Sequence, residues 1–531
     1  MLDRREFTRG LLGAVAGHAV PNAAMGQSGV SEAAGLRIAG PAFGVTTLDP
    51  ALARDLPTQM IARQVFRGLL KFDDDLQPVP DLAASVESAP DAKRYIFTLR
   101  EDAVFSSGDP ITSDKVVASL TRALRPETAR LAGGSLAAVA YLQDIRGAAG
   151  VLEEEAGDVA GMQIIDHRTL AIELEAPSST FLSRIAHVST SIVDVSETRD
   201  APRTWWQTPN ASGPYRVAAY SGSEVRLERN PAYQVLPAKM SPLVFLTGVA
   251  ASNPFNLYQQ DAVDLVPVSD AQAGRLAEDP ASEIVAKVFR TPAFASGYIA
   301  LGNQQSPLDD VHVRRALQRL IAPDSLAVTT FGGGVIPATG LIPPGMLGRV
   351  WPGGIVSPDV GDAAGELAQS RFGRGAAVPP ISIHAADIEP VEALRDIALA
   401  ELDLRIEAIA VNWNDFLDGL AERRFAAYSL YWGADYPDPA AFLDLLFHSA
   451  AADNYTGYRN LALDAILETA REELDVSQRA ELYEMAQAEL LDDGGVIPLY
   501  HDVTVSLVRP NLQGVDLTPM GLLYMEDAVE T

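Results

Sequence analysis

Ile381-Ser382-Ile383-His384 is the first of three short apolar segments that alternate with helical patterns late in the chain. The other two are Leu404-Arg405-Ile406-Glu407-Ala408 and Phe425-Ala426-Ala427-Tyr428-Ser429-Leu430-Tyr431. Between the first two segments, apolar residues recur at helical spacing at Val391, Leu394, Ile397, Ala398 and Leu402, and a second helix is expected near Asn414 to Arg423. Strand, helix, strand, helix, strand in this order predicts a right-handed parallel βαβαβ unit and an α/β fold.

The loop after the third strand is rich in aromatic and carboxylate side chains. It reads Trp432-Gly433-Ala434-Asp435-Tyr436-Pro437-Asp438-Pro439. In open parallel sheets, ligands bind beyond the carboxyl ends of the strands. The loop is therefore a candidate site on its position alone.

Other elements are expected along the rest of the chain. A strand and a helix fit residues 36–66, alternation predicts a strand at Tyr95-Ile96-Phe97-Thr98-Leu99-Arg100, and another strand fits Thr169 to Leu174. Ser113 and Ser477 stand where helix N-caps are expected.

Length and composition narrow the function. The 531 residues favour two or three domains, and 41 Lys and Arg against 70 Asp and Glu give a net charge of −29. This charge is spread along the chain and disfavours binding to nucleic acid or to anionic membranes. With no cysteine, the chain has no disulfide, no thiolate metal site, no cysteine nucleophile and no lipid-anchored cysteine.

The N-terminus resembles an export signal. Arg4 and Arg5 precede Phe7 and a mildly apolar run over residues 10–20, and small residues follow at Ala23, Ala24 and Gly26. This order is typical of a signal peptide over residues 1–26, and the arginine pair favours the twin-arginine type over an ordinary secretion signal. We expect cleavage between residues 23 and 28, and a soluble periplasmic product.

Catalysis has little support in the sequence. There is no Gly-x-Ser-x-Gly elbow, no His-Glu-x-x-His and no phosphate-binding loop, and the seven histidines are scattered. The carboxylates of Asp435 and Asp438 are a pair that glycoside hydrolysis could use, but no other feature points to that reaction. We expect no catalytic residues, no metal and no cofactor.

Five stretches, in order, resemble the large extracytoplasmic solute-binding proteins of the dipeptide, oligopeptide and nickel importers, which form family 5. They cover about residues 46–515 and comprise Asp81-Leu82-Ala83 with Tyr95 to Arg100, Ser212-Gly213-Pro214-Tyr215 with Leu227 to Tyr233, Val313-Arg314-Arg315-Ala316-Leu317, Trp432 to Pro439, and Tyr458-Arg459-Asn460. The chain is most similar to the oligopeptide-binding members.

The resemblance implies a two-lobed periplasmic binding protein fold of type II, with an extra subdomain and a ligand cleft between the lobes. Lobe I would comprise residues 27–66, the extra subdomain at 67–177, and residues 178–288. Lobe II would cover residues 289–495, and residues 496–531 would return to lobe I.

The implied function is capture of a di- or oligopeptide in the periplasm and its delivery to a permease and ATPase complex in the inner membrane. The protein would act as a monomer and not as an enzyme. A non-peptide ligand, such as a metal chelate, an opine, a glutathione-like compound or an oligosaccharide, is the alternative, and an exported hydrolase is a more distant one.

The resemblance also implies site residues. Asp435 matches a carboxylate that holds a peptide's α-ammonium group, although it could instead cap a turn ahead of Pro437. Trp432 and Trp413 match aromatic positions of the cleft, although either could instead pack in the core, and Tyr436 belongs to the same loop as Trp432. Tyr298 lies near the crossover between lobes, where ligand contact and core packing are both open. No basic residue that could receive a peptide carboxylate is evident just before Trp432.

Overall fold

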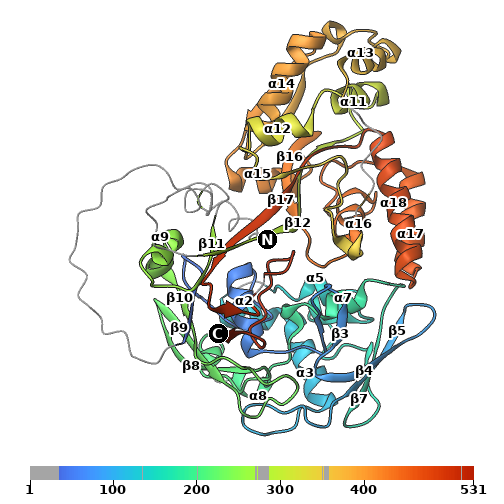
Figure 1. Ribbon diagram of the computed structural model, residues 1–531. Helices are drawn as coiled ribbons and strands as arrows, with labels where there is room; N and C mark the ends of the chain where they lie inside the picture. Colours follow the sequence, from blue (N-terminus) through green and yellow to red (C-terminus); the bar gives the residue numbers. More distant parts are fainter. Residues whose placement is uncertain are drawn as a thin grey trace.

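The computed structural model describes residues 35–531 apart from 134–135, 200, 269–271, 273–285, 350, 352–357, 452 and 516. The predicted signal peptide therefore lies outside the described residues. Figure 1 shows two bodies, a lower one in blue and green and an upper one in yellow to red. Two long strands, β12 (Lys287–Leu301) and β17 (Val496–Val508), run between them and pair antiparallel.

These two strands sit at the centre of one large sheet, ordered β15-β14-β16-β12-β17-β11-β1-β10-β9-β8, with β13 (Ile336–Pro337) paired to β17. Their close contact depends on a glycine. A Cβ atom added at Gly297 would lie 2.3 Å from the ring of Tyr500, so a larger residue would require that ring to move. Because both strands enter both bodies, they join the two lobes through continuous backbone pairing.

The lower body holds one half of the sheet, with β1 parallel to β10 and to β11. It comprises β1 (Leu36–Ala39), α2 (Leu56–Val65), β8 (Tyr215–Ser221), β9 (Glu224–Arg229), β10 (Leu243–Leu246), α9 (Pro254–Gln259) and β11 (Leu265–Val268). Helix α2 begins after Asp55, whose side chain accepts a hydrogen bond from Thr58 N.

A separate antiparallel sheet, ordered β4-β5-β7-β6, lies in the lower body. This part comprises β2 (Leu70–Phe72), β3 (Pro78–Pro80), β4 (Ala83–Ser88), β5 (Arg94–Leu99), α3 (Ser113–Leu124), α4 (Pro126–Ala132), α5 (Val139–Leu142), α6 (Ala148–Leu152), β6 (Met162–Ile164), β7 (Thr169–Glu173), α7 (Phe181–Ile185) and α8 (Val195–Thr198). The strands predicted at 95–100 and 169–174 are confirmed as β5 and β7.

The upper body contains the predicted βαβαβ unit. Its elements are β14 (Ile381–Ala385), α14 (Glu389–Leu402), β15 (Ile406–Ala410), α15 (Trp413–Ala421) and β16 (Ala427–Gly433). Strand β14 pairs parallel with both β15 and β16, which confirms the prediction. The remaining elements are α11 (Val311–Gln318), α12 (Pro323–Thr329), α13 (Val360–Gln369), α16 (Leu443–Phe447), α17 (Leu461–Glu472) and α18 (Val476–Asp492).

Both predicted serine caps are wrong. Thr112 occupies the N-cap position of α3, and the Ser113 hydroxyl donates to the backbone oxygen of Asp166 instead. Asp475 caps α18, since its carboxylate accepts a hydrogen bond from Gln478 N. Ser477 therefore lies inside the first turn of the helix.

The C-terminal segment returns to the lower body, where β18 (Leu512–Gln513) pairs with β19 (Val529–Glu530). On its way it contacts the crossing strands, because Phe294 N donates to Pro519 O over 2.9 Å. The lobes also touch elsewhere. Ser179 N donates to Arg471 O over 2.8 Å at the end of α17.

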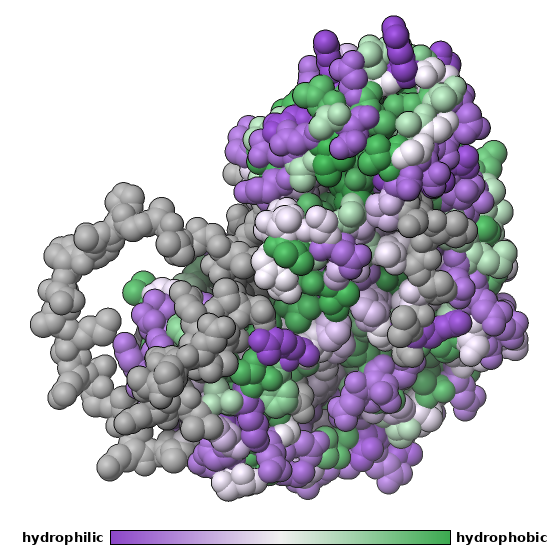
Figure 2. Space-filling model, turned by 45° about the horizontal axis from the view of Figure 1, so that its top comes forward, coloured by the Kyte–Doolittle hydropathy of each residue, from purple (hydrophilic) through white to green (hydrophobic). Residues whose placement is uncertain are grey.

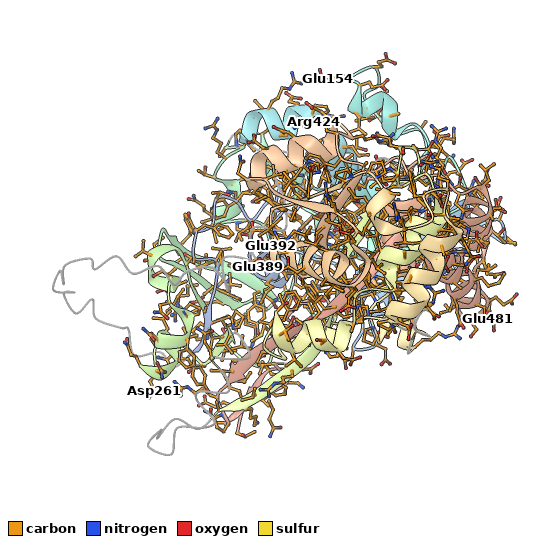
Figure 3. The ribbon with its side chains drawn as sticks, turned by 90° about the horizontal axis from the view of Figure 1, so that it is seen from above. Glu154, Asp261, Glu389, Glu392, Arg424 and Glu481 are labelled. Atoms are coloured by element: carbon orange, nitrogen blue, oxygen red, sulfur yellow. The ribbon has the colours of Figure 1, made fainter. Side chains whose placement is uncertain are left out.

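Charge and polarity are distributed over the surface as the sequence suggested. In Figure 2, polar residues cover much of the visible surface and apolar residues form smaller patches between them. The exposed acids Glu154, Asp261 and Glu481, labelled in Figure 3, lie on three separate parts of the molecule. No helix in the described part of the chain is long and apolar enough to cross a membrane.

Candidate ligand-binding site

The candidate loop begins where β16 leaves the sheet. Gly433 is the last residue of β16 and pairs with Ala295 of β12. The next residue, Ala434, still donates its N–H to Phe294 O over 2.8 Å. The loop residue Asp435 is therefore held one position beyond a hydrogen bond to the strand that connects the lobes.

Trp413 lies at the same edge of the sheet. It begins α15, three residues after the end of β15, and Val411 N donates to Ala385 O at the end of β14 over 2.9 Å. Because β14, β15 and β16 are parallel, their carboxyl ends meet at one edge. The indole is half-buried, with its ring centroid 6.0 Å from that of Phe416.

The two loop carboxylates have different environments. Asp435 is half-buried beside the exposed Gly433. Asp438 is 1% exposed, and Arg479 of α18 donates to it through Nε at 3.1 Å, with Nη2 at 3.0 Å. Its other oxygen accepts from Ala440 N. Burial raises the pKa of Asp438, and Arg479 opposes that rise.

This arrangement weighs against a hydrolytic pair. Glycoside hydrolysis needs two carboxylates that both face the substrate. Asp438 is instead occupied by Arg479 of α18 and by the turn that it caps, so it cannot serve as the second carboxylate of such a pair.

The loop aromatics are mostly buried. The indole Nε1 of Trp432 donates to Ala441 O over 2.8 Å, and the side chain is 6% exposed. Tyr436 is also 6% exposed, and burial raises the pKa of its hydroxyl well above the usual value. Each of these two rings therefore leaves only a small part of its surface for a ligand.

Tyr298 is fully buried between two other aromatic rings. Its ring centroid lies 6.3 Å from that of Tyr428 and 6.2 Å from that of Phe447. This position favours core packing, one of the two roles that the sequence left open. The structure brings together the loop residues and places Trp413 at their edge of the sheet, while Tyr298 lies in the packed interior.

Among the described residues, no group of histidine, aspartate and glutamate side chains is arranged to hold a metal ion. The site is thus built from a carboxylate, aromatic edges and backbone groups. Such a set can bind a polar or cationic organic group through charge and shape.

Comparison with known proteins identifies the family. The model of the bacterial extracellular solute-binding proteins, family 5, matches residues 77–454. The chain belongs to this family.

Family 5 relatives match the chain over nearly its whole length. The periplasmic oligopeptide-binding protein OppA of Escherichia coli K12 is 28% identical over 488 residues, which cover 88% of each chain. Among solved structures, the unliganded open form of the periplasmic murein tripeptide-binding protein MppA superposes with a TM-score of 0.81 at 23% identity, covering 94% of this chain and 98% of that one. The Haemophilus influenzae OppA complex with the peptide RPPGFSPFR gives 0.69 at 22% identity, covering 93% and 98%.

The family and the two-lobed α/β fold predicted from the sequence motifs are thereby confirmed. The relatives are binding proteins by name. The family match and the names of these relatives both agree with the solute-binding class of protein that the five motifs indicate.

Sequence reasoning missed one carboxylate near the crossing strands. Asp502 of β17 accepts a hydrogen bond from the Tyr431 hydroxyl at 2.9 Å, and burial raises its pKa. Tyr431 belongs to β16, next to the loop. In the sequence, the only signal is that Asp502 is the one acidic residue in the stretch 496–508.

Proposed function

We propose that this protein is a periplasmic solute-binding protein of an ABC importer, which binds peptides between its two lobes and delivers them to a membrane permease. The observation that carries the proposal is the position of Asp435. Its half-buried carboxylate follows β16, beyond the carboxyl ends of parallel strands and next to the strand that joins the lobes. The family relatives named for oligopeptides support the choice of ligand.

In this proposal, Asp435 holds the peptide's α-ammonium group. A fixed carboxylate in a partly dehydrated site binds an ammonium through a short, charge-assisted hydrogen bond. Trp413 provides apolar surface at the same edge of the sheet, with smaller contributions from the edges of Trp432 and Tyr436. No chemical step is needed, so the protein acts as a receptor and not as an enzyme.

Delivery would depend on a change between open and closed arrangements of the lobes. The chain superposes better on an unliganded open form than on a peptide complex, which supports an open arrangement without ligand. Closure by hinge motion would bury the peptide and create the surface that the permease and its ATPase recognise. The N-terminal arginine pair would direct export of the protein to the periplasm, where it would act as a monomer.

The test uses the purified mature protein and a pool of peptides from a casein digest. Protein that has been mixed with the pool is separated by gel filtration, and the retained small molecules are released and identified by mass spectrometry. The proposal expects retained, uncut peptides and a higher melting temperature in their presence. Cleaved peptides would indicate a hydrolase, and the absence of any retained peptide would contradict peptide binding.

A further inference from the structure

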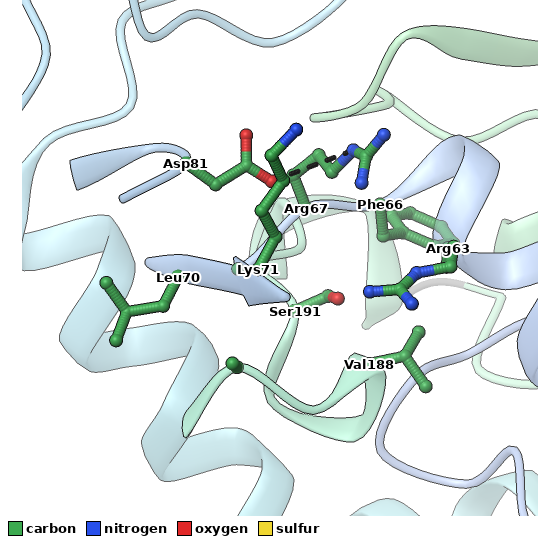
Figure 4. Close-up of a pocket in the computed structure, with 10 residues that line it drawn as sticks. Arg63, Phe66, Arg67, Leu70, Lys71, Asp81, Val188 and Ser191 are labelled. Atoms are coloured by element: carbon green, nitrogen blue, oxygen red, sulfur yellow. Dashed lines mark ion pairs between the residues drawn. The ribbon is translucent and has the colours of Figure 1, made fainter. Parts of the chain in front are cut away.

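A second polar site lies in the lower body, at the carboxyl end of α2. A small pocket opens between the end of this helix, strand β2 and residues 186–191. Three basic side chains line it: Arg63, Arg67 and Lys71. Figure 4 shows the guanidinium of Arg63 pointing into the pocket, toward Ser191.

The charge of Arg67 is balanced by nearby carboxylates. Arg67 pairs with Glu526 and lies 3.7 Å, Nε to Oδ2, from Asp81. Asp81 also accepts a hydrogen bond from the Tyr233 hydroxyl at 2.9 Å. Glu526 is therefore paired with Arg67, and Asp81 is shared between Arg67 and Tyr233. The second oxygen of each carboxylate, Asp81 Oδ2 and Glu526 Oε2, makes no hydrogen bond with the described residues.

Arg63 forms no ion pair with a carboxylate of the described residues. It is 5% exposed, and its Nε and Nη1 atoms make no hydrogen bond with the described residues. The guanidinium carbon of Arg63 lies over the ring of Tyr524, 4.3 Å from its centroid. An aromatic face stabilises a cation but leaves most of its N–H donors unused.

Lys71 adds to the positive excess. It is half-buried, and no carboxylate of the described residues forms an ion pair with its ammonium. Burial and the neighbouring charge of Arg67 lower the pKa of Lys71, and burial lowers that of Arg63. Three cations thus face two carboxylates in a chain whose net charge is −29.

Buried cations with unused donors are costly, because charge and N–H groups have both lost water without gaining partners. A carboxylate that entered the pocket would satisfy the free edge of Arg63 and offset the excess charge. A planar guanidinium matches a carboxylate with two parallel hydrogen bonds.

The pocket is linked to the Asp435 loop by a short path. Tyr524, which covers Arg63, lies five residues after Pro519, and Pro519 O accepts the hydrogen bond from Phe294 N. Phe294 O in turn accepts from the residue before Asp435. Five residues span at most about 17 Å, and a turn at residues 518–522 shortens that reach. An extended peptide of a few residues has a similar length.

We propose that this pocket binds the carboxylate of the peptide ligand, with Arg63 as its direct hydrogen-bond donor and Lys71 as a second positive charge at its edge. The inference rests on the proposed function. It assigns to the lower body the basic group that is missing from the strand before Trp432, so the two ends of a peptide would be held by the two lobes.

The experiment compares tri-, tetra- and penta-alanine, each with a free C-terminal carboxylate and as the C-terminal amide. Binding to the wild-type protein, to Arg63→Gln and to Lys71→Gln is measured by calorimetry. Lys115→Gln is the matched control, because it removes one positive charge from a half-buried lysine elsewhere in the same lobe. The melting temperature of each unliganded variant reports on folding.

We expect the wild type and Lys115→Gln to bind the carboxylate at least about thirtyfold more tightly than the amide, since an unpaired buried charge is expensive. Arg63→Gln should lose this preference, and Lys71→Gln should reduce it. Equal binding of both forms by the wild type, or an unchanged preference in Arg63→Gln, would reject the inference and leave peptide binding standing. If the wild type bound neither form, the proposed function itself would be contradicted.

Discussion

Arg479 holds Asp438 through Nε at 3.1 Å and Nη2 at 3.0 Å, with both side chains almost fully buried. The contact fixes the loop after β16 to helix α18, which lies 41 residues further along the chain. Asp435 is three residues before the anchored aspartate. The contact between Asp438 and Arg479 therefore fixes this end of the loop to α18.

Replacing Arg479 with Met should destabilise the fold. The change leaves the Asp438 carboxylate buried without its cation, and breaking a buried pair costs about 3–5 kcal/mol. Urea unfolding should show this loss in the free energy of unfolding. Replacing both residues, as Arg479→Met with Asp438→Asn, should recover part of it.

The matched control for this pair is Arg130→Met. Arg130 pairs with Glu154 at the surface, where both side chains are more than half exposed. Exposed pairs contribute about 0–1 kcal/mol, so the free energy of unfolding should change little. A similar loss in both variants would contradict the anchoring role of Arg479.

His501 should make the fold sensitive to acid. It is 6% exposed on β17, and burial lowers its pKa to about 4. The Ser296 hydroxyl donates to Leu341 O, so His501 Nδ1 donates to the Ser296 oxygen, at 2.7 Å. The folded state thus keeps a neutral ring where the unfolded chain, with a pKa near 6.5, takes up a proton.

Between about pH 6.5 and pH 4, the unfolded chain binds a proton at His501 and the folded state does not. The free energy of unfolding is therefore unaffected by this residue above about pH 6.5 and decreases as the pH falls toward 4. The loss attributable to His501 should reach about 3 kcal/mol between pH 7 and pH 4. Urea unfolding of the wild type and of His501→Gln at both pH values measures it. Parallel pH dependence in the two proteins would show that the histidine does not titrate in this way.

Local patterns predicted the fold where neighbours in sequence decide the structure. The βαβαβ unit follows from apolar periodicity over residues 381–431, and the structure reproduces each strand and helix within a few residues. The two cap predictions failed because residues one or two positions apart compete for the N-cap position. Thr112 takes the N-cap position ahead of Ser113, and Asp475 takes it ahead of Ser477. The residue at which the backbone becomes helical decides which of the two is the cap.

Contacts between residues far apart in the chain could not be predicted from local sequence patterns. Asp435 and Asp438 look alike in their loop, and only Arg479 of a later helix distinguishes them. The positive excess around Arg63 depends on Glu526, more than 450 residues away, which pairs with a different arginine. The spacing of apolar residues along the chain does not indicate which distant residues form pairs.

Export should depend on the N-terminal arginine pair. Replacing Arg4 and Arg5 with Lys preserves charge but removes the guanidinium pair typical of twin-arginine signals. We expect precursor to accumulate in the cytoplasm, as seen by fractionation and immunoblotting. Normal maturation of the variant would favour an ordinary secretion signal, and unprocessed wild-type protein in the cytoplasm would reject the signal peptide.

Ligand binding should make the molecule more compact. A two-lobed receptor that closes on its ligand lowers its radius of gyration. Small-angle scattering with and without the retained casein peptides measures this change. An identical scattering profile at saturating peptide would argue against hinge closure.

Asp435→Asn should weaken peptide binding and leave the unliganded fold intact. The amide keeps the shape of the carboxylate but removes the charge, so the peptide ammonium would be buried without its anion. This costs about 3–5 kcal/mol, which lowers affinity by a factor of hundreds or more. Because Asp435 is half-buried, the melting temperature without ligand should barely move. Asp418→Asn, at an exposed position of α15, is the control and should bind normally.

N-acetylation of the peptide tests the same contact from the ligand's side. If Asp435 holds the α-ammonium group, acetylation should reduce affinity strongly for the wild type and much less for Asp435→Asn, because each change removes the same pair. Calorimetry on the four combinations gives the coupling energy between the two groups. A coupling near zero, or normal binding by Asp435→Asn, would mean that this aspartate only shapes its turn and that the ammonium is held elsewhere.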